Sequence, residues 1–127
     1  NLTVTANVRL PHARLRGAER AAFLELEREA CAAVGLPCDA RPVRELSGGQ
    51  RRRVSILRCV LADADAFLFD EPLKGMDEKT VDAVMDFVVP RLAGHTTLWV
   101  THDERELSRF DDPVLWRVEG GRVILCS

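Results

Sequence analysis

The chain has 127 residues, of which 46% are hydrophobic, and its 18 basic and 20 acidic residues leave a net charge of −2. This balance provides no strongly basic surface, so we expect no nucleic-acid partner. No apolar run approaches the roughly 18–20 residues that span a bilayer, and no signal peptide is expected in the first ten residues.

Four cysteines are spread along the chain, at positions 31, 38, 59 and 126. None of them forms a C-x-x-C pair, and no histidine stands at the spacing of a shared metal site. We therefore predict reduced, mostly buried thiols rather than a metal or redox site. Reduced thiols are typical of the cytoplasm, where we expect this protein to be.

The first part of the chain is predicted to be helical. After a short segment over 1–11, apolar residues recur at helical intervals over 18–34. Gly35 follows the last predicted turn and Pro37 lies just beyond it, as is typical of a helix end. Residues 1–45 are therefore expected to form a helical subdomain.

The remaining residues, 46–127, are predicted to alternate strands and helices. Apolar periodicity predicts helices that begin at 47 and that cover 78–92 and 104–110. Short apolar runs predict strands over 66–69, 96–100, 114–118 and 123–126. The expected fold class is α/β, with a mostly parallel sheet and flanking helices.

Two adjacent acids, Asp70 and Glu71, follow the strand expected over 66–69. Ligands of open α/β sheets bind at the carboxyl ends of the strands. Because side chains alternate along a strand, the two carboxylates point in different directions. One can hold Mg²⁺, directly or through water, while the other polarises the water that attacks a phosphorus atom. Taken alone, such a pair is more often a pair of solvated acids.

Two further segments are candidates for contact with phosphate. His102 follows the strand expected over 96–100 and can contact a γ-phosphate, although a lone histidine there is more often a capping residue. Ser47, Gly48 and Gly49 begin a helix, where small residues let backbone N–H groups approach an anion. Taken singly, this segment is more often a plain N-cap.

Four motifs occur in a fixed order along the chain: Leu46–Gln50, Phe69–Pro72, Gly75–Asp77 and Val100–Asp103. In this order and spacing, the chain resembles the ATP-binding-cassette (ABC) ATPases over nearly its whole length. The resemblance implies a P-loop NTPase fold of ABC type, with ATP and Mg²⁺ as cofactors. It also implies a head-to-tail dimer with a second ATPase subunit, and residues 1–45 resemble the subdomain that precedes the signature.

The signature residues are Ser47, Gly48, Gly49 and Gln50. By resemblance, they contact the γ-phosphate of an ATP molecule that the other subunit holds. The three arginines at 51–53 follow directly, where basic residues are common in the family. Their charges are expected to add a modest field that favours phosphate.

The same resemblance implies roles for four residues after the signature. Asp70 matches the Walker B acid that supports Mg²⁺, with contact through water expected. Glu71 matches the catalytic carboxylate, and His102 matches the switch histidine. Asp77 matches the D-loop acid that communicates across the dimer.

No G-x-x-x-x-G-K-[ST] motif occurs among the 127 residues. The phosphate loop, the adenine-stacking aromatic residue and the Q-loop glutamine of the family are therefore expected upstream of residue 1. Without the strands of that part, the strand over 66–69 is expected to lack a neighbour and to present an apolar edge. The isolated chain is expected neither to bind ATP tightly nor to hydrolyse it.

The resemblance favours the ATPase subunit of a membrane transporter, a bacterial importer, lying on the inner face of the membrane against transmembrane permease subunits. Residues 72–77 are similar to the Pro-Phe-Lys-Gly-Leu-Asp form of some nitrate, sulfonate and taurine importers. The alternative is a soluble ABC ATPase of translation or DNA repair. Translation-type proteins usually have Pro-Thr-Asn-His-Leu-Asp here, and chromosome-associated ones carry long coiled coils before the signature.

Overall fold

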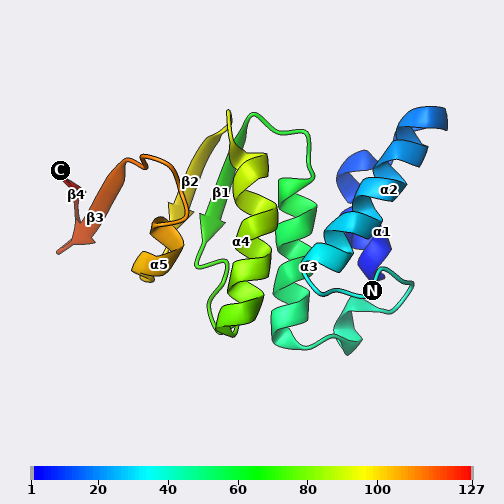
Figure 1. The fold of residues 1–127 in the computed structure, drawn as a ribbon, viewed down its shortest axis with the longest axis horizontal. Helices are drawn as coiled ribbons and strands as arrows, with labels where there is room; N and C mark the ends of the chain where they lie inside the picture. Colours follow the sequence, from blue (N-terminus) through cyan, green and yellow to red (C-terminus); the bar gives the residue numbers. More distant parts are fainter. Residues whose placement is uncertain (1, 127) are drawn as a thin grey trace.

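A computed structural model describes residues 2–126 of the chain as helices stacked beside a small parallel sheet, with a hairpin at one end (Figure 1). The α-helices are α1 (Val4–Val8), α2 (Gly17–Ala33), α3 (Gly48–Val60), α4 (Glu78–Leu92) and α5 (Glu104–Leu107). The strands are β1 (Ala66–Asp70), β2 (Thr96–Val100), β3 (Leu115–Glu119) and β4 (Arg122–Cys126), and short 3-10 turns cover Leu10–His12 and Val43–Glu45. The α/β fold class predicted from the sequence is confirmed.

The parallel sheet consists of β1 and β2, with Leu68 opposite Leu98. Alternating side chains of β1 point to opposite faces, so that Phe67 and Phe69 are each only 5% exposed while Leu68 is 66% exposed. The buried face packs against α4, α3 lies beside α4, and α1 and α2 lie beyond (Figure 1). One hydrophobic core therefore runs through both halves of the chain.

The amino-terminal segment contains a helix that the sequence patterns did not predict. Thr3 caps α1 by accepting a hydrogen bond from the N–H of Ala6 at 3.2 Å. Val4 and Val8, one turn apart, are both fully buried. Five residues hold too few apolar positions for a helical period to be visible, so this helix depends on packing against α3.

A buried ion pair fixes the amino-terminal segment to α2. Glu27 is 1% exposed and accepts from Nη2 of Arg9 at 2.6 Å and from its Nε at 2.9 Å. The contact with Glu27 raises the pKa of Arg9 above its ordinary value. Because an isolated buried carboxylate is costly, this pair ties the fold of the first residues to the position of α2.

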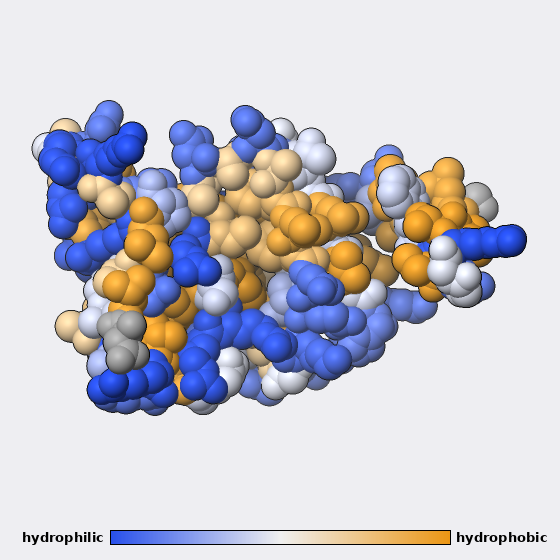
Figure 2. Space-filling view, turned by 180° about the vertical axis from the view of Figure 1, so that it is seen from behind, coloured by the Kyte–Doolittle hydropathy of each residue, from blue (hydrophilic) through white to orange (hydrophobic). Residues whose placement is uncertain are grey.

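The strand after residue 65 was expected to lack a neighbour and to present an edge. On one side β2 pairs with β1 along its whole length, whereas the other edge of β1 is unpaired within residues 2–126. The unprotected apolar surface is a face of the sheet and not an edge alone. Leu68, Leu98 and Val100 are 66%, 53% and 43% exposed on that face. Figure 2 shows apolar residues gathered over the back of the sheet, where no helix covers it.

The strands β3 and β4 form a two-stranded antiparallel hairpin and do not extend the parallel sheet. Opposite residues of an antiparallel pair share a face, so Trp116 and Leu125 lie beside Val118 and Val123. All four are 63–72% exposed, and Figure 2 shows the hairpin as a separate projection. A lone hairpin is marginally stable in water, so this surface is suited to burial against another segment. Within residues 2–126, no helix is both long and apolar enough to cross a bilayer.

Candidate functional site

The predicted motifs gather at one end of the molecule. Figure 1 shows that α3 and α4 begin at the same end at which β1 and β2 finish. The signature segment opens α3, residues 71–77 join β1 to α4, and residues 101–103 join β2 to α5. This end combines the carboxyl ends of parallel strands with the amino ends of helices, both of which favour anionic ligands.

The signature segment is held by a capping box. The hydroxyl oxygen of Ser47 accepts from the N–H of Gln50 at 3.2 Å, and the side-chain oxygen of Gln50 accepts from the N–H of Ser47 at 3.0 Å. Between them, the N–H groups of Gly48 and Gly49 have no hydrogen-bond partner within residues 2–126. The turn can therefore offer unpaired donors to an anion.

Glu71 and His102, which are 31 residues apart in sequence, are in direct contact. Nδ1 of His102 donates to Oε1 of Glu71 at 2.7 Å, and the two side chains are 70% and 30% exposed, respectively. The backbone N–H of Glu71 also donates to the carbonyl of Val100 at 2.8 Å, which ties the ends of β1 and β2 together. Nδ1 is engaged by the carboxylate, and Nε2 of the ring has no hydrogen-bond partner among residues 2–126, so it can meet an incoming group.

The backbone at Glu71 has a φ of 46°, in the left-handed region that side chains other than glycine rarely adopt. Such a conformation costs about 1 kcal/mol. Strained backbone of this kind clusters at functional sites, where it aims a side chain that a relaxed strand end would aim elsewhere. The strain at Glu71 therefore supports a functional role for its carboxylate.

Asp70 ends β1 on the same face as Leu68, away from the helices. Its carboxylate makes no hydrogen bond to another residue in the described part of the chain. Among residues 2–126, no group of three or more histidine, cysteine or acidic side chains is placed to hold a metal ion. A single free carboxylate fits Mg²⁺, which proteins commonly bind through one or two carboxylates together with water and substrate phosphates.

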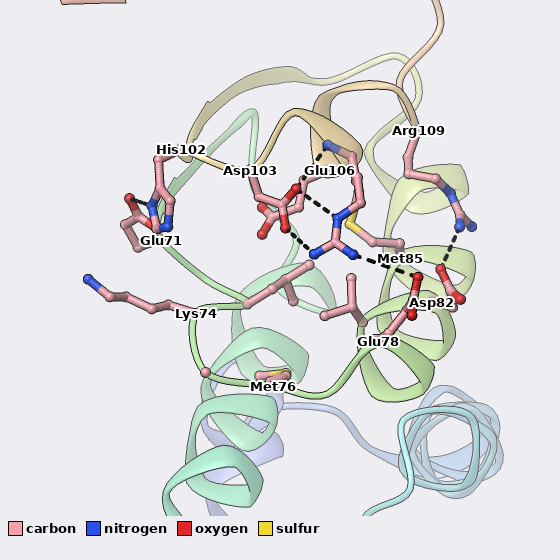
Figure 3. Close-up of a pocket in the computed structure, with 14 residues that line it drawn as sticks. Glu71, Lys74, Met76, Glu78, Asp82, Met85, His102, Asp103, Glu106 and Arg109 are labelled. Atoms are coloured by element: carbon pink, nitrogen blue, oxygen red, sulfur yellow. Dashed lines mark hydrogen bonds and ion pairs between the residues drawn. The ribbon is translucent and has the colours of Figure 1, made fainter.

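Asp77 caps α4 and does not contact Glu71 or His102. Its carboxylate accepts from the hydroxyl of Thr80 at 2.7 Å and from the N–H of Thr80 at 3.0 Å. These hydrogen bonds hold the pKa of Asp77 below its usual range. A hollow of about 250 Å³ lies between residues 71–78, α4 and α5. Figure 3 shows Glu71 and His102 together at one side of it.

Two arginines after the signature make specific contacts, although their charges were predicted only to add a field that favours phosphate. Arg52 donates from Nη1 to the carbonyl of Lys74 at 2.5 Å, and Arg53 donates from Nη1 to the hydroxyl of Thr80 at 3.4 Å. Both contacts join α3 to the segment that leads from β1 to α4. The run of three arginines gives no indication of these contacts, because the partners are a backbone carbonyl and a distant hydroxyl.

The ABC transporter family model matches residues 3–74. This range is more than half of the chain, and it includes both the capped signature turn and the Asp70–Glu71 pair. The chain belongs to the ABC transporter family. The family resemblance that the sequence motifs indicated is thereby confirmed.

Curated relatives are ATP-binding proteins of transporters within this ABC family. The sn-glycerol-3-phosphate import ATP-binding protein UgpC of Jannaschia sp. (strain CCS1) is 38% identical over 104 residues, which cover 79% of this chain and 30% of that protein. The glutathione/L-cysteine transport system ATP-binding/permease protein CydC of Escherichia coli (strain K12) is 38% identical over 81 residues, covering 64% and 14%. The chain therefore spans no more than 30% of the length of either relative.

A solved structure shares the fold of this ABC family member. The dimeric post-hydrolysis state of the ATP-binding cassette MJ0796, bound to ADP and Pi, matches with a TM-score of 0.68 and 28% identity. The match covers 86% of this chain and 50% of that one. The described residues therefore form about half of an ABC ATPase fold, as the missing phosphate loop led us to expect.

Proposed function

We propose that this chain is part of the ATP-hydrolysing subunit of a membrane transporter, most simply a bacterial importer. ATP would be bound and hydrolysed where two such subunits pack head to tail. The observation that supports this best is the contact between Glu71 and His102 at the carboxyl ends of two parallel strands. The import function named for UgpC supports the direction of transport.

Each motif residue has a role in this proposal. Glu71 orients and polarises the water that attacks the γ-phosphate, while His102 holds the carboxylate and meets the γ-phosphate through Nε2. Asp70 would hold Mg²⁺ through water, and the ion when bound neutralises charge on the phosphates. Asp77 faces the partner subunit from the start of α4.

The signature turn acts on the other ATP of the dimer. Ser47, Gly48 and Gly49 would present backbone N–H groups and a hydroxyl to the γ-phosphate held by the partner, and Gln50 keeps the turn closed. The phosphate loop that holds this subunit's own ATP lies outside the 127 residues.

The partners and location follow from the same proposal. A second ATPase subunit completes both sites, and transmembrane permease subunits are moved by closure of the dimer, with residues 1–45 as their contact. The protein would then lie on the cytoplasmic face of the membrane. We propose no cargo, because the segment 72–77 and the name of UgpC point to different ones.

Glu71→Gln in the complete ATPase tests the central assignment. We expect turnover of ATP to be abolished while ATP-driven dimerisation, measured by size-exclusion chromatography, persists. Glu104→Gln is the matched control, since Glu104 is an exposed acid near the site. Unchanged turnover in Glu71→Gln would overturn the assignment.

A further inference from the structure

The short helix α5 follows His102 and is held to α4 by a set of charges that we call the α4–α5 latch. Three acids lie one turn apart along α4, and two arginines lie one turn apart on and just after α5. The latch consists of Glu78, Asp82, Asp86, Arg105 and Arg109.

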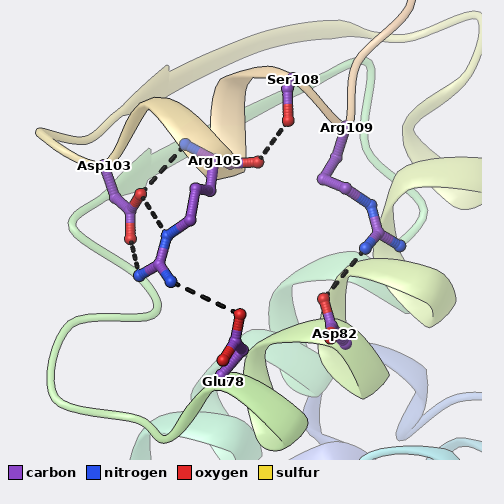
Figure 4. Close-up of polar contacts among 6 residues, drawn as sticks. All are labelled: Glu78, Asp82, Asp103, Arg105, Ser108 and Arg109. Atoms are coloured by element: carbon purple, nitrogen blue, oxygen red, sulfur yellow. Dashed lines mark hydrogen bonds and ion pairs between the residues drawn. The ribbon is translucent and has the colours of Figure 1, made fainter.

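The latch contains two neighbouring groups of contacts, one around Arg105 and one around Arg109 (Figure 4). Nη1 of Arg105 lies 3.6 Å from Oε1 of Glu78, and Nη1 of Arg109 donates to Oδ1 of Asp82 at 3.1 Å. Arg109 also pairs with Asp86 through its second terminal nitrogen. Arg105 from α5 and Arg109 from just after α5 therefore each reach across the hollow to α4.

Arg105 also fixes the residue next to His102. It donates to Asp103 from Nε at 3.1 Å and from Nη2 at 2.8 Å, while its backbone N–H donates to the same carboxylate at 3.0 Å. These contacts hold the pKa of Asp103 below its usual range. The arginine thus connects the start of α4 to the residue that follows His102.

Other contacts hold only the inner side of α5. Glu106 is 5% exposed and accepts from Nε1 of Trp99 at 2.8 Å, which anchors α5 to β2. A helix of one turn has no stability of its own, so its orientation depends on such external contacts. On the outer side, those contacts are the ion pairs of the latch.

We propose that the α4–α5 latch positions His102 against Glu71, with Arg105 as its central positioning residue. The inference rests on the proposed function for its effect on turnover, but not for its effect on geometry. The side chain of His102 is exposed and contacts Glu71. Because His102 lies between β2 and α5, the orientation of these two elements determines where its ring lies. The latch consequently makes the Glu71–His102 contact sensitive to ionic strength.

A salt bridge that positions a residue differs from one that stabilises the fold in what changes when salt weakens it. The Debye length falls from about 10 Å at 0.1 M salt to about 3 Å at 1 M, so exposed pairs weaken over that range. Exposed pairs usually add little to stability. The proposal therefore predicts a change in the position of His102 with little change in the urea midpoint of the chain.

The test compares Arg105→Gln, Arg105→Lys and Arg109→Gln with the control Lys79→Gln. Lys79 is exposed in the first turn of α4, next to Glu78, and its removal takes away the same charge without touching the latch. The position of His102 is measured in the 127-residue chain by NMR, from the ring ¹⁵N shifts and the NOE to the Glu71 side chain. ATP turnover is measured in the complete ATPase with the same variants.

In Arg105→Gln, we expect the NOE to be lost and the Nδ1 shift to move toward that of a free imidazole. Arg105→Lys should retain both in part. In the wild type, 1 M salt should weaken the NOE because it screens both the latch and the exposed Glu71–His102 pair. In the complete ATPase, kcat should fall about tenfold while KM for ATP is unchanged, because the latch orients a catalytic pair and does not bind nucleotide.

An unaltered NOE in both Arg105→Gln and Arg109→Gln, or an equal loss in Lys79→Gln, would overturn the latch. A lost NOE in an ATPase whose Glu71→Gln variant turns over normally would support the latch and overturn the proposed function. The two ideas therefore fail on different measurements.

Discussion

Replacing Gly49 by alanine separates what the fold needs from what the proposed site needs. Gly49 lies in the first turn of α3, outside the left-handed region, and a Cβ built there meets no atom within 4 Å. Alanine is favoured over glycine in a helix by about 0.5–1 kcal/mol. This change stabilises the first turn of a helix less than its interior, so we expect the free energy of unfolding to rise by about 0.5 kcal/mol.

Urea unfolding of the 127-residue chain, followed by circular dichroism, measures this change. With a slope of about 1.5 kcal/mol per molar, the midpoint should rise by about 0.3 M. Gly35→Ala is the matched control, because a Cβ at Gly35 also meets nothing within 4 Å but its φ is +64°. Alanine in that conformation costs about 1 kcal/mol, so the control midpoint should fall by about 0.7 M.

The same Gly49→Ala change in the complete ATPase should lower turnover about 100-fold, the effect of displacing a reacting group by about 1 Å. The methyl group would lie where a phosphate oxygen approaches the backbone N–H. A lower urea midpoint for Gly49→Ala would refute the reasoning, because the glycine would then serve the helix itself. Normal turnover would show that no ligand approaches this turn.

Three further predictions concern the chain by itself. Arg9→Met should lower the free energy of unfolding by about 2 kcal/mol in the same urea assay. Breaking a fully buried pair costs roughly 3–5 kcal/mol, and the loss should be smaller here because the side chain of Arg9 is 37% exposed. An unchanged urea midpoint would contradict this prediction. Burial raises the pKa of Cys31 to about 12, so the folded chain keeps a proton that the unfolded chain releases above about pH 8.5. The free energy of unfolding should therefore fall as pH rises above that value. Urea midpoints measured below and above about pH 8.5 should differ less in Cys31→Ala than in the wild type. Finally, calorimetry should find no micromolar binding of ATP to the isolated chain, and such binding would show that no outside phosphate loop is needed.

The sequence predicted the longer helices well, because their apolar residues repeat over several turns, and it predicted strands from short continuous apolar runs. The helix expected over 78–92 has those bounds in the structure, as does the strand over 96–100. The helix α1 was missed because it has room for only Val4 and Val8 on its buried side. The apolar residues of the hairpin predicted strands but not their separation from the parallel sheet, since pairing partners leave no local pattern.

The site was predictable as a set of motifs but not as a set of contacts. Glu71 and His102 were assigned separate roles, and their hydrogen bond emerged only from the pairing of β1 with β2. The sequence does contain a pattern from which the latch could have been predicted. Acids at 78, 82 and 86 and arginines at 105 and 109 share a four-residue spacing, which suits two facing helical surfaces.

The capping box at the start of α3 has a consequence for how quickly a ligand can be recognised. The hydroxyl of Ser47 is used there as an acceptor, so its hydrogen stays available to donate. An arriving anion would break no existing bond and would order no loose loop, because folding has already fixed the turn. Recognition of this kind needs little reorganisation, so capture and release can both be fast. If two subunits close on each other's nucleotide as proposed, such a preset surface would let them bind and release it in every cycle.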